Sequence, residues 1–145
     1  MAREKKWGRF DLTEDAQEVY DSAVSEIEDV QTELQDWLES MQGTNLENSR
    51  RVEEIDSAIP EIEEYLDSLS DLSEDLQPFL KNKKVTYKEF RKANPTKGNR
   101  FNNAIYKLWA VVQLTEEGKE EALDEISSEL VDCIDGLESV SFPGR

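Results

Sequence analysis

Two runs of apolar residues at heptad spacing, one on each side of Gly43, limit the folds open to this chain. In both runs the apolar positions recur at alternating intervals of three and four residues, as they do along one face of an α-helix. We therefore predict two long amphipathic helices with a coiled-coil-like seam. The apolar positions of the two runs are Ala16, Tyr20, Ala23, Ile27, Val30, Leu34, Trp37 and Met41, and Val52, Ile55, Ile59, Ile62, Leu66 and Leu69.

The two runs match each other when the chain folds back at Gly43. Glycine at this point is typical of a left-handed helix stop, and Thr44 or Asn45 is suited to cap the helix that follows. Antiparallel pairing then puts an apolar residue opposite another in every layer, with small residues facing large ones. The predicted layers are Ala16 with Leu69, Tyr20 with Leu66, Ala23 with Ile62, Ile27 with Ile59, Val30 with Ile55, and Leu34 with Val52.

The ends of this hairpin carry further signals. Asp11 and Glu14 form a capping box that would open the first helix, and Trp7 and Phe10 are expected to close the base of the hairpin. Pro60 falls inside the second run, so we expect a kink or a short break near residues 57–60.

Three shorter helices are predicted after the hairpin, over residues 86–94, 99–113 and 116–135. Thr86 with Glu89 would open the first, Thr115 would cap the third, and Gly136 would stop it. The prediction is an all-α fold, a long antiparallel helical hairpin braced by three shorter C-terminal helices. Its parts are a basic N-terminal segment (1–10), the acidic hairpin (11–80), a basic segment with the three helices packed on the base of the hairpin (81–137), and a tail (138–145). In the tail, the side chain of Phe142 is expected to pack against the rest of the fold.

Composition argues against an enzyme. The chain has no histidine and one cysteine, which excludes histidine-dependent catalysis, a histidine-ligated metal and an internal disulfide. Cys133 lies in the apolar stripe of a predicted helix and is expected to be a small buried hydrophobe. We expect no catalytic residue, no cofactor and no metal site. No apolar run resembles a signal peptide or a membrane span, so we expect a soluble intracellular protein, cytoplasmic or within a viral particle.

Charge is distributed very unevenly along the chain. The formal net charge is -17, yet residues 81–107 hold nine positive charges and one carboxylate. In one interpretation this basic segment lies against the acidic hairpin of its own chain or of a neighbouring copy and offsets the repulsion between carboxylates. The residues predicted to form the basic surface, for a protein partner or nucleic acid, are Lys81, Lys83, Lys84, Lys88, Arg91, Lys92, Lys97, Arg100, Asn103 and Lys107.

Nucleic-acid binding by the basic segment is the alternative. In the predicted helix 99–113, Arg100, Asn103 and Lys107 fall on one line away from the apolar stripe, and arginine and asparagine can bond base edges. The two helices from 86 to 113 resemble a helix-turn-helix, and LTEEGKEEAL at 114–123 resembles a stretch of winged-helix regulators. A second alternative is that the acidic helices imitate the phosphates of DNA and inhibit a DNA-binding protein.

The hairpin tip supplies the other candidate surface. Trp37 and Met41 have no apolar residue opposite them in the predicted register, and they either cap the hairpin locally or dock a partner. We call Trp37, Met41, Leu46, Arg50 and Arg51 the tip surface. The sequence thus favours a non-enzymatic assembly or adaptor protein that binds protein partners, or copies of itself as a homo-oligomer, through the tip surface and the basic segment. By analogy of architecture alone, small viral scaffolding or connector proteins have this general plan.

Overall fold

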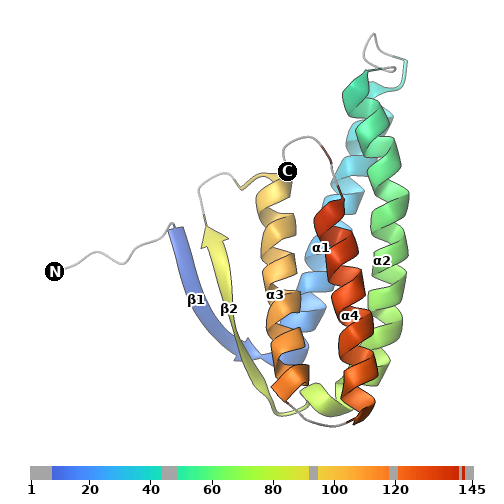
Figure 1. The fold of residues 1–145 in the computed structure, drawn as a ribbon. Helices are drawn as coiled ribbons and strands as arrows, with labels where there is room; N and C mark the ends of the chain where they lie inside the picture. Colours follow the sequence, from blue (N-terminus) through green and yellow to red (C-terminus); the bar gives the residue numbers. More distant parts are fainter. Residues whose placement is uncertain (1–7, 44–48, 92–94, 118–120, 141, 143–145) are drawn as a thin grey trace, which may run out of the picture.

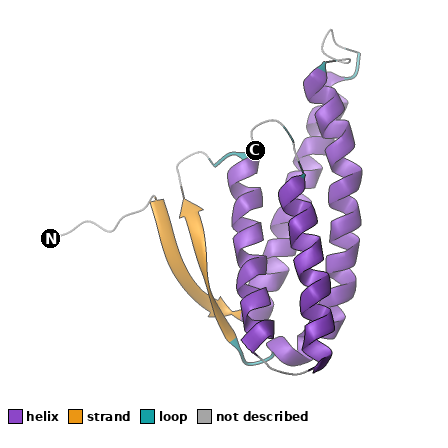
Figure 2. Ribbon diagram, in the orientation of Figure 1, coloured by secondary structure: helices purple, strands orange, loops and turns teal. Residues whose placement is uncertain are grey.

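The computed structural model describes residues 8–43, 49–91, 95–117, 121–140 and 142. They form four helices and one two-stranded sheet, so the chain is mostly helical but not entirely so. Along the chain the elements are β1 (Gly8–Asp15), α1 (Ala16–Met41), α2 (Arg50–Leu80), β2 (Lys84–Arg91), α3 (Lys97–Glu117) and α4 (Glu121–Ser139). The helices pack into a bundle, and the sheet lies beside α3 (Figures 1 and 2).

Helices α1 and α2 lie side by side and run in opposite directions (Figure 1). The carboxylate of Asp15 accepts hydrogen bonds from the backbone N–H groups of Gln17 and Glu18, so Asp15 caps α1. The predicted capping box is wrong, because Asp11 and Glu14 belong to β1. Gly43 has a φ of 78°, the left-handed conformation expected of a helix stop.

Two side-chain bonds join α1 to α2, each about one helical turn away from the predicted layers. The Tyr20 hydroxyl donates to the carbonyl of Leu69, and the Gln31 side chain donates to the carbonyl of Ile59 at 3.1 Å. The pairing of individual layers, and hence the coiled-coil-like seam, stays a prediction. The predicted caps Thr44 and Asn45 lie outside the described residues, and the side chain of Ser49 caps α2.

Pro60 does not break α2. The helix is continuous from Arg50 to Leu80, so the short break is wrong and the alternative, a kink, stays a prediction. The ring of Pro60 is exposed, while Ala58 and Ile62 on either side of it are buried in the core. Tertiary packing of this face therefore outweighs the cost of the proline, which is roughly 3 kcal/mol inside a helix.

A strand replaces the first of the three predicted C-terminal helices. β2 pairs antiparallel with β1, from Gly8 opposite Arg91 to Asp15 opposite Lys84. Val85 and Tyr87 are buried and the residues between them are exposed, which is the period of two expected of a strand. The predicted helix 86–94, and with it the resemblance to a helix-turn-helix, is therefore wrong.

The last two helices also differ from the predictions at their ends. α3 contains the predicted helix 99–113 but continues past Thr115, which is not a cap; its hydroxyl donates to the carbonyl of Val112. Gly136 does not stop α4, which continues into the predicted tail. Phe142 is buried as expected, with its ring edge-on to Phe101 at 5.4 Å between centroids. In Figure 1 one end of the α1–α2 pair extends beyond α3 and α4.

Candidate functional site

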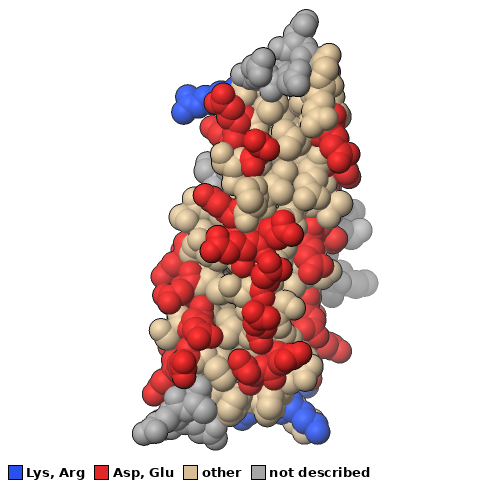
Figure 3. All heavy atoms as spheres, turned by 90° about the vertical axis from the view of Figure 1, so that its right-hand side faces the viewer, with Lys and Arg blue, Asp and Glu red and all other residues tan. Residues whose placement is uncertain are grey.

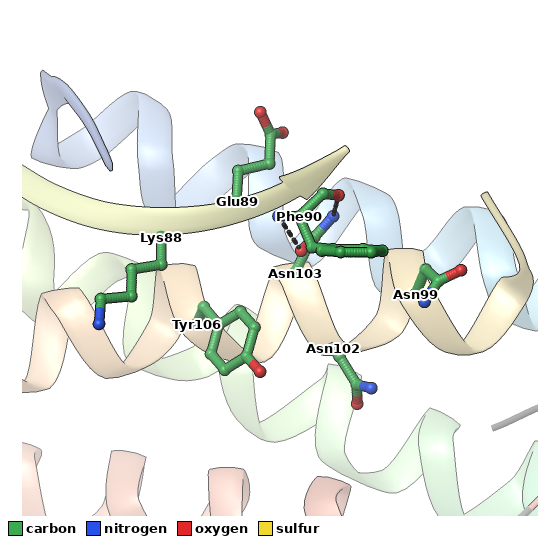
Figure 4. A pocket seen from close by; sticks show the side chains of 7 residues that line it. All are labelled: Lys88, Glu89, Phe90, Asn99, Asn102, Asn103 and Tyr106. Carbon is green, nitrogen blue, oxygen red and sulfur yellow. Dashed lines mark hydrogen bonds between the residues drawn. The ribbon is translucent and has the colours of Figure 1, made fainter. Parts of the chain in front are cut away.

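The most distinctive surface feature is a hollow of about 420 Å³ between β2 and α3 (Figure 4). Phe90 and Tyr106 line it, and they are 36% and 45% exposed, the two large hydrophobic residues found exposed among those described. Figure 4 shows Lys88 and Tyr106 on the same side of the strand and Glu89 pointing away. Besides the two aromatics, the lining residues are Lys88, Glu89, Asn99, Asn102 and Asn103.

A second hollow of about 250 Å³ continues the first along the same two elements. Both are lined by Lys88 and Tyr106, so they meet there. We call the two hollows together the β2–α3 groove. The second hollow is lined also by Asp11, Thr86, Tyr87, Trp109, Ala110 and Gln113.

Asn103 fixes the end of β2 to α3. Its side-chain N–H donates to the carbonyl of Phe90 at 2.9 Å, and its side-chain oxygen accepts the N–H of Phe90 at 3.0 Å. Both backbone groups of Phe90 therefore point toward α3 and away from β1. Along an antiparallel strand, the backbone groups of successive residues point alternately toward the partner strand and away from it. The two bonds of Phe90 therefore identify the residues of β2 whose backbone groups point away from β1.

Tyr87, which lines the second hollow, belongs to a cluster of polar side chains that connects β2 with β1, α1 and α3. Lys107 is only 8% exposed; its ammonium group donates to the hydroxyl of Ser22 at 2.9 Å and lies 5.5 Å from the ring centroid of Tyr87. The Tyr87 hydroxyl donates to Glu14 at 2.8 Å. Burial raises the pKa of Tyr87 well above its usual value, and the hydrogen bond to Glu14 raises it further. The phenol is thus held neutral, and these bonds connect the second hollow to β1 and α1.

Three residues of the predicted basic surface, Arg100, Asn103 and Lys107, bond to other helices or strands of the chain. Arg100 is half-buried and pairs with Glu33 and, at 3.9 Å, with Glu26, both on α1. Since Asn103 holds β2 and Lys107 is buried, the line of Arg100, Asn103 and Lys107 is not the exposed face that the sequence predicted. The pairing of Arg100 with α1 agrees with the interpretation in which the basic segment lies against its own acidic helices.

The other predicted basic residues are mostly on the surface. Lys97 is half-buried, and Lys92 lies outside the described residues. Arg91 is exposed but contacts Glu89 at 2.6 Å and lies over the ring of Phe10 at 5.1 Å. The remaining exposed members, on β2 and the turn before it, are Lys81, Lys83, Lys84 and Lys88.

The structure favours the local-cap interpretation for part of the tip surface. Trp37 is half-buried and packs against the hydrophobic core, and Met41 is half-buried as well. Leu46 lies outside the described residues. Arg50 and Arg51 are exposed, and Arg50 is 3.6 Å from Glu54 one turn along α2. Docking of a partner at this surface stays a prediction.

Cys133 is buried as predicted, at the edge of an acidic hollow between α2 and α4. Burial raises the pKa of its thiol, which disfavours the nucleophilic thiolate.

Figure 3 shows carboxylates scattered over the face of the molecule that carries α2. Within the described ranges, no group of three or more cysteine and acidic side chains is arranged to hold a metal ion.

Sequence reasoning did not find the β2–α3 groove, because it placed Phe90 on a helix. The signal that could have found it is the alternation in KVTYKEF at 84–90, which fits a strand. Tyr106 falls within the predicted helix 99–113, and its side chain is exposed on α3.

Comparisons with protein-family models, curated proteins and solved structures gave no match for this chain. In the part of the chain that the structure describes, none of the helices combines the length and the apolar character needed to cross a bilayer.

Proposed function

We propose that this protein is a non-enzymatic adaptor or assembly protein that holds an acidic protein partner, or a second copy of itself, in the β2–α3 groove. The observation that carries this proposal is the exposure of Phe90 and Tyr106 beside Lys88. Aromatic side chains on a surface are enriched where proteins bind one another, and they contribute much of the binding energy there.

The distribution of positive and negative residues supports an acidic partner. Lys88 lines both hollows, and Lys81, Lys83 and Lys84 are exposed on β2 and the turn before it, whereas most of the remaining chain is acidic. An acidic partner would be attracted to this region and repelled elsewhere, so the charge distribution would orient it. In this proposal α1 and α2 form a coiled-coil-like antiparallel hairpin, and the partner held in the groove does not contact the tip surface.

Affinity purification from the native host tests the proposal. We expect Tyr106→Ala to lose the partner that the unaltered protein retains, because the change removes an exposed ring without disturbing the core. Arg51→Ala, an exposed change on the tip surface, is the matched control and should retain it. Loss with Arg51→Ala but not with Tyr106→Ala would move the contact site to the tip and contradict the assignment of the groove.

Nucleic-acid binding is a second candidate, favoured by exposed aromatic rings beside lysines and asparagines. Bases of a single strand can stack on such rings while lysines contact phosphates. We expect this function to show as salt-sensitive binding of a fluorescent oligonucleotide that Lys88→Glu weakens. Absence of binding in dilute salt would argue against it.

Imitation of DNA by the acidic helices is a third candidate, which the carboxylate-covered face in Figure 3 supports. The protein would then displace DNA from a host DNA-binding protein. Failure to compete with DNA across a panel of such proteins would remove this candidate.

A further inference from the structure

We propose that the partner enters the β2–α3 groove as an extended acidic segment that pairs with β2 and adds a third strand to the sheet. This inference rests on the proposed function and names the partner's chemistry. Its starting point is the direction of the backbone groups along β2, which the bonds between Phe90 and Asn103 establish.

Thr86 and Lys88 present free backbone groups to the groove. Backbone groups of alternate residues point to the same edge of a strand, so Thr86 and Lys88 point where Phe90 does, away from β1. Outside the pairing of β1 with β2, no hydrogen bond to the backbone N–H or C=O of either residue is found among the described residues. The hydroxyls of Thr13 and Thr86 lie 2.8 Å apart, which fits their place in a closely spaced, non-hydrogen-bonded pair.

Asn103 already occupies the position of a third strand at the end of β2. Its amide donates to and accepts from Phe90, the same two bonds that a residue of a neighbouring strand would make. Among the described residues, no side chain is seen to bond to the backbone of Thr86 or Lys88 as Asn103 bonds to that of Phe90. Both residues line the second hollow. A strand entering the groove would therefore pair with Thr86 and Lys88 and meet Asn103 at the end.

The groove also indicates which side chains the segment carries. On one face of the extended sheet, Lys84 and Lys88 are exposed, and carboxylates directly across from them would form favourable cross-strand pairs. On the opposite face Val85 and Tyr87 are buried, so the side chains that an added strand places on that face point toward the core and suit apolar residues. An extended segment that alternates acidic and apolar residues satisfies both sets of contacts.

The probe is a blocked nonapeptide that alternates glutamate with valine. Nuclear magnetic resonance should show slower hydrogen exchange at the amides of Thr86 and Lys88 when the peptide binds. Two control peptides define the binding mode, one with lysine in place of glutamate and one with alternate backbone nitrogens methylated. Neither control should bind, because the first reverses the charge and the second removes the strand's donors. Equal binding by the methylated peptide would overturn strand addition, and equal binding by the lysine peptide would overturn the acidic specificity.

Thr86→Pro and Thr86→Val form a matched pair on the protein. Proline removes the free N–H at the groove without removing a bond between β1 and β2, whereas valine keeps the N–H and loses only the hydroxyl. We expect Thr86→Pro to weaken peptide binding about tenfold relative to Thr86→Val, the effect of one lost hydrogen bond. Circular dichroism of both variants confirms the fold; if proline disrupts it, the methylated peptide decides the question. Equal affinity of two folded variants would overturn the proposal.

Two further outcomes separate this inference from the proposed function. If Tyr106→Ala loses the native partner but no acidic peptide protects Thr86 and Lys88, strand addition is wrong and the adaptor function stands. If these amides become protected in the unliganded protein as its concentration rises, a second copy fills the groove and the inferred occupant is wrong.

Discussion

Gly136 shows how one residue can serve a purpose that the sequence does not reveal. A Cβ at this position would lie 2.2 Å from a ring carbon of Tyr65, so the absence of a side chain lets α4 approach α2 closely. Glycine near the end of an apolar run is also the usual helix stop, and the sequence alone favours that interpretation. Cys133, by contrast, was predicted correctly, because a cysteine in an apolar stripe is usually buried.

Gly136→Ala should destabilise the protein by about 1 kcal/mol. Overpacking against Tyr65 costs roughly 1–3 kcal/mol, and the better helix propensity of alanine offsets part of this. In a Tyr65→Ala background the same change should be stabilising, because only the propensity remains. Urea unfolding of the four proteins measures both effects, and a change of the same sign in both backgrounds would contradict the close contact.

Alkaline pH should weaken the fold through Tyr20 and Tyr87. Burial raises the pKa of both phenols above that of an unfolded tyrosine, which is about 10. A raised folded pKa contributes stability that is complete below the unfolded pKa and is lost as the pH rises through the folded pKa. The free energy of unfolding should therefore fall above about pH 10. Tyr87→Phe should reduce this dependence, and an unchanged slope would contradict the assignment.

At the level of helices and strands, the sequence predicted correctly the elements whose signal lies within the segment itself. The runs on both sides of Gly43 identified α1 and α2, because helix periodicity is a local signal. β2 was missed because its partner, β1, lies far away in the sequence, and the pairing of GRFDLTED with KVTYKEFR is not visible in either segment. The capping pattern of Thr86 and Glu89 then favoured a helix that does not form.

Pro60→Ala should stabilise α2. The proline ring is exposed, so alanine loses no packing and restores a backbone donor inside the helix. Proline costs roughly 3 kcal/mol in a helix interior, and its restriction of the unfolded chain returns up to about 1 kcal/mol. A gain of about 2 kcal/mol in the free energy of unfolding is expected. Pro95→Ala, outside the helices, is the control; a loss of stability at position 60 would indicate that the helix needs the proline.

At the scale of the whole molecule, the sequence indicated where the basic residues lie but did not indicate the β2–α3 groove. The sequence identified the basic segment, and Arg100 does pair with the acidic helix α1. It could not predict that Lys107 is buried or that Phe90 and Tyr106 share a groove, because these facts depend on how β2 lies against α3. The β2–α3 groove is therefore a candidate surface that the sequence did not predict.

Salt should raise the melting temperature. With a net charge of -17, repulsion between exposed carboxylates opposes the compact state, and salt screens it over a Debye length of about 10 Å at 0.1 M. Calorimetry between dilute and 0.5 M potassium chloride measures the shift, and Glu33→Gln reports the part due to the pair with Arg100. A melting temperature that falls with salt would show that ion pairs outweigh the repulsion.

Photo-cross-linking in the native host decides whether the β2–α3 groove is the contact surface. A benzoyl-phenylalanine at position 106 places a reactive group in the groove, and the same residue at position 51 places it at the tip. Covalent adducts with a partner protein or a second copy should form from position 106 and be absent from position 51. Adducts from position 51 alone, or from neither position, would contradict the proposed role of the groove.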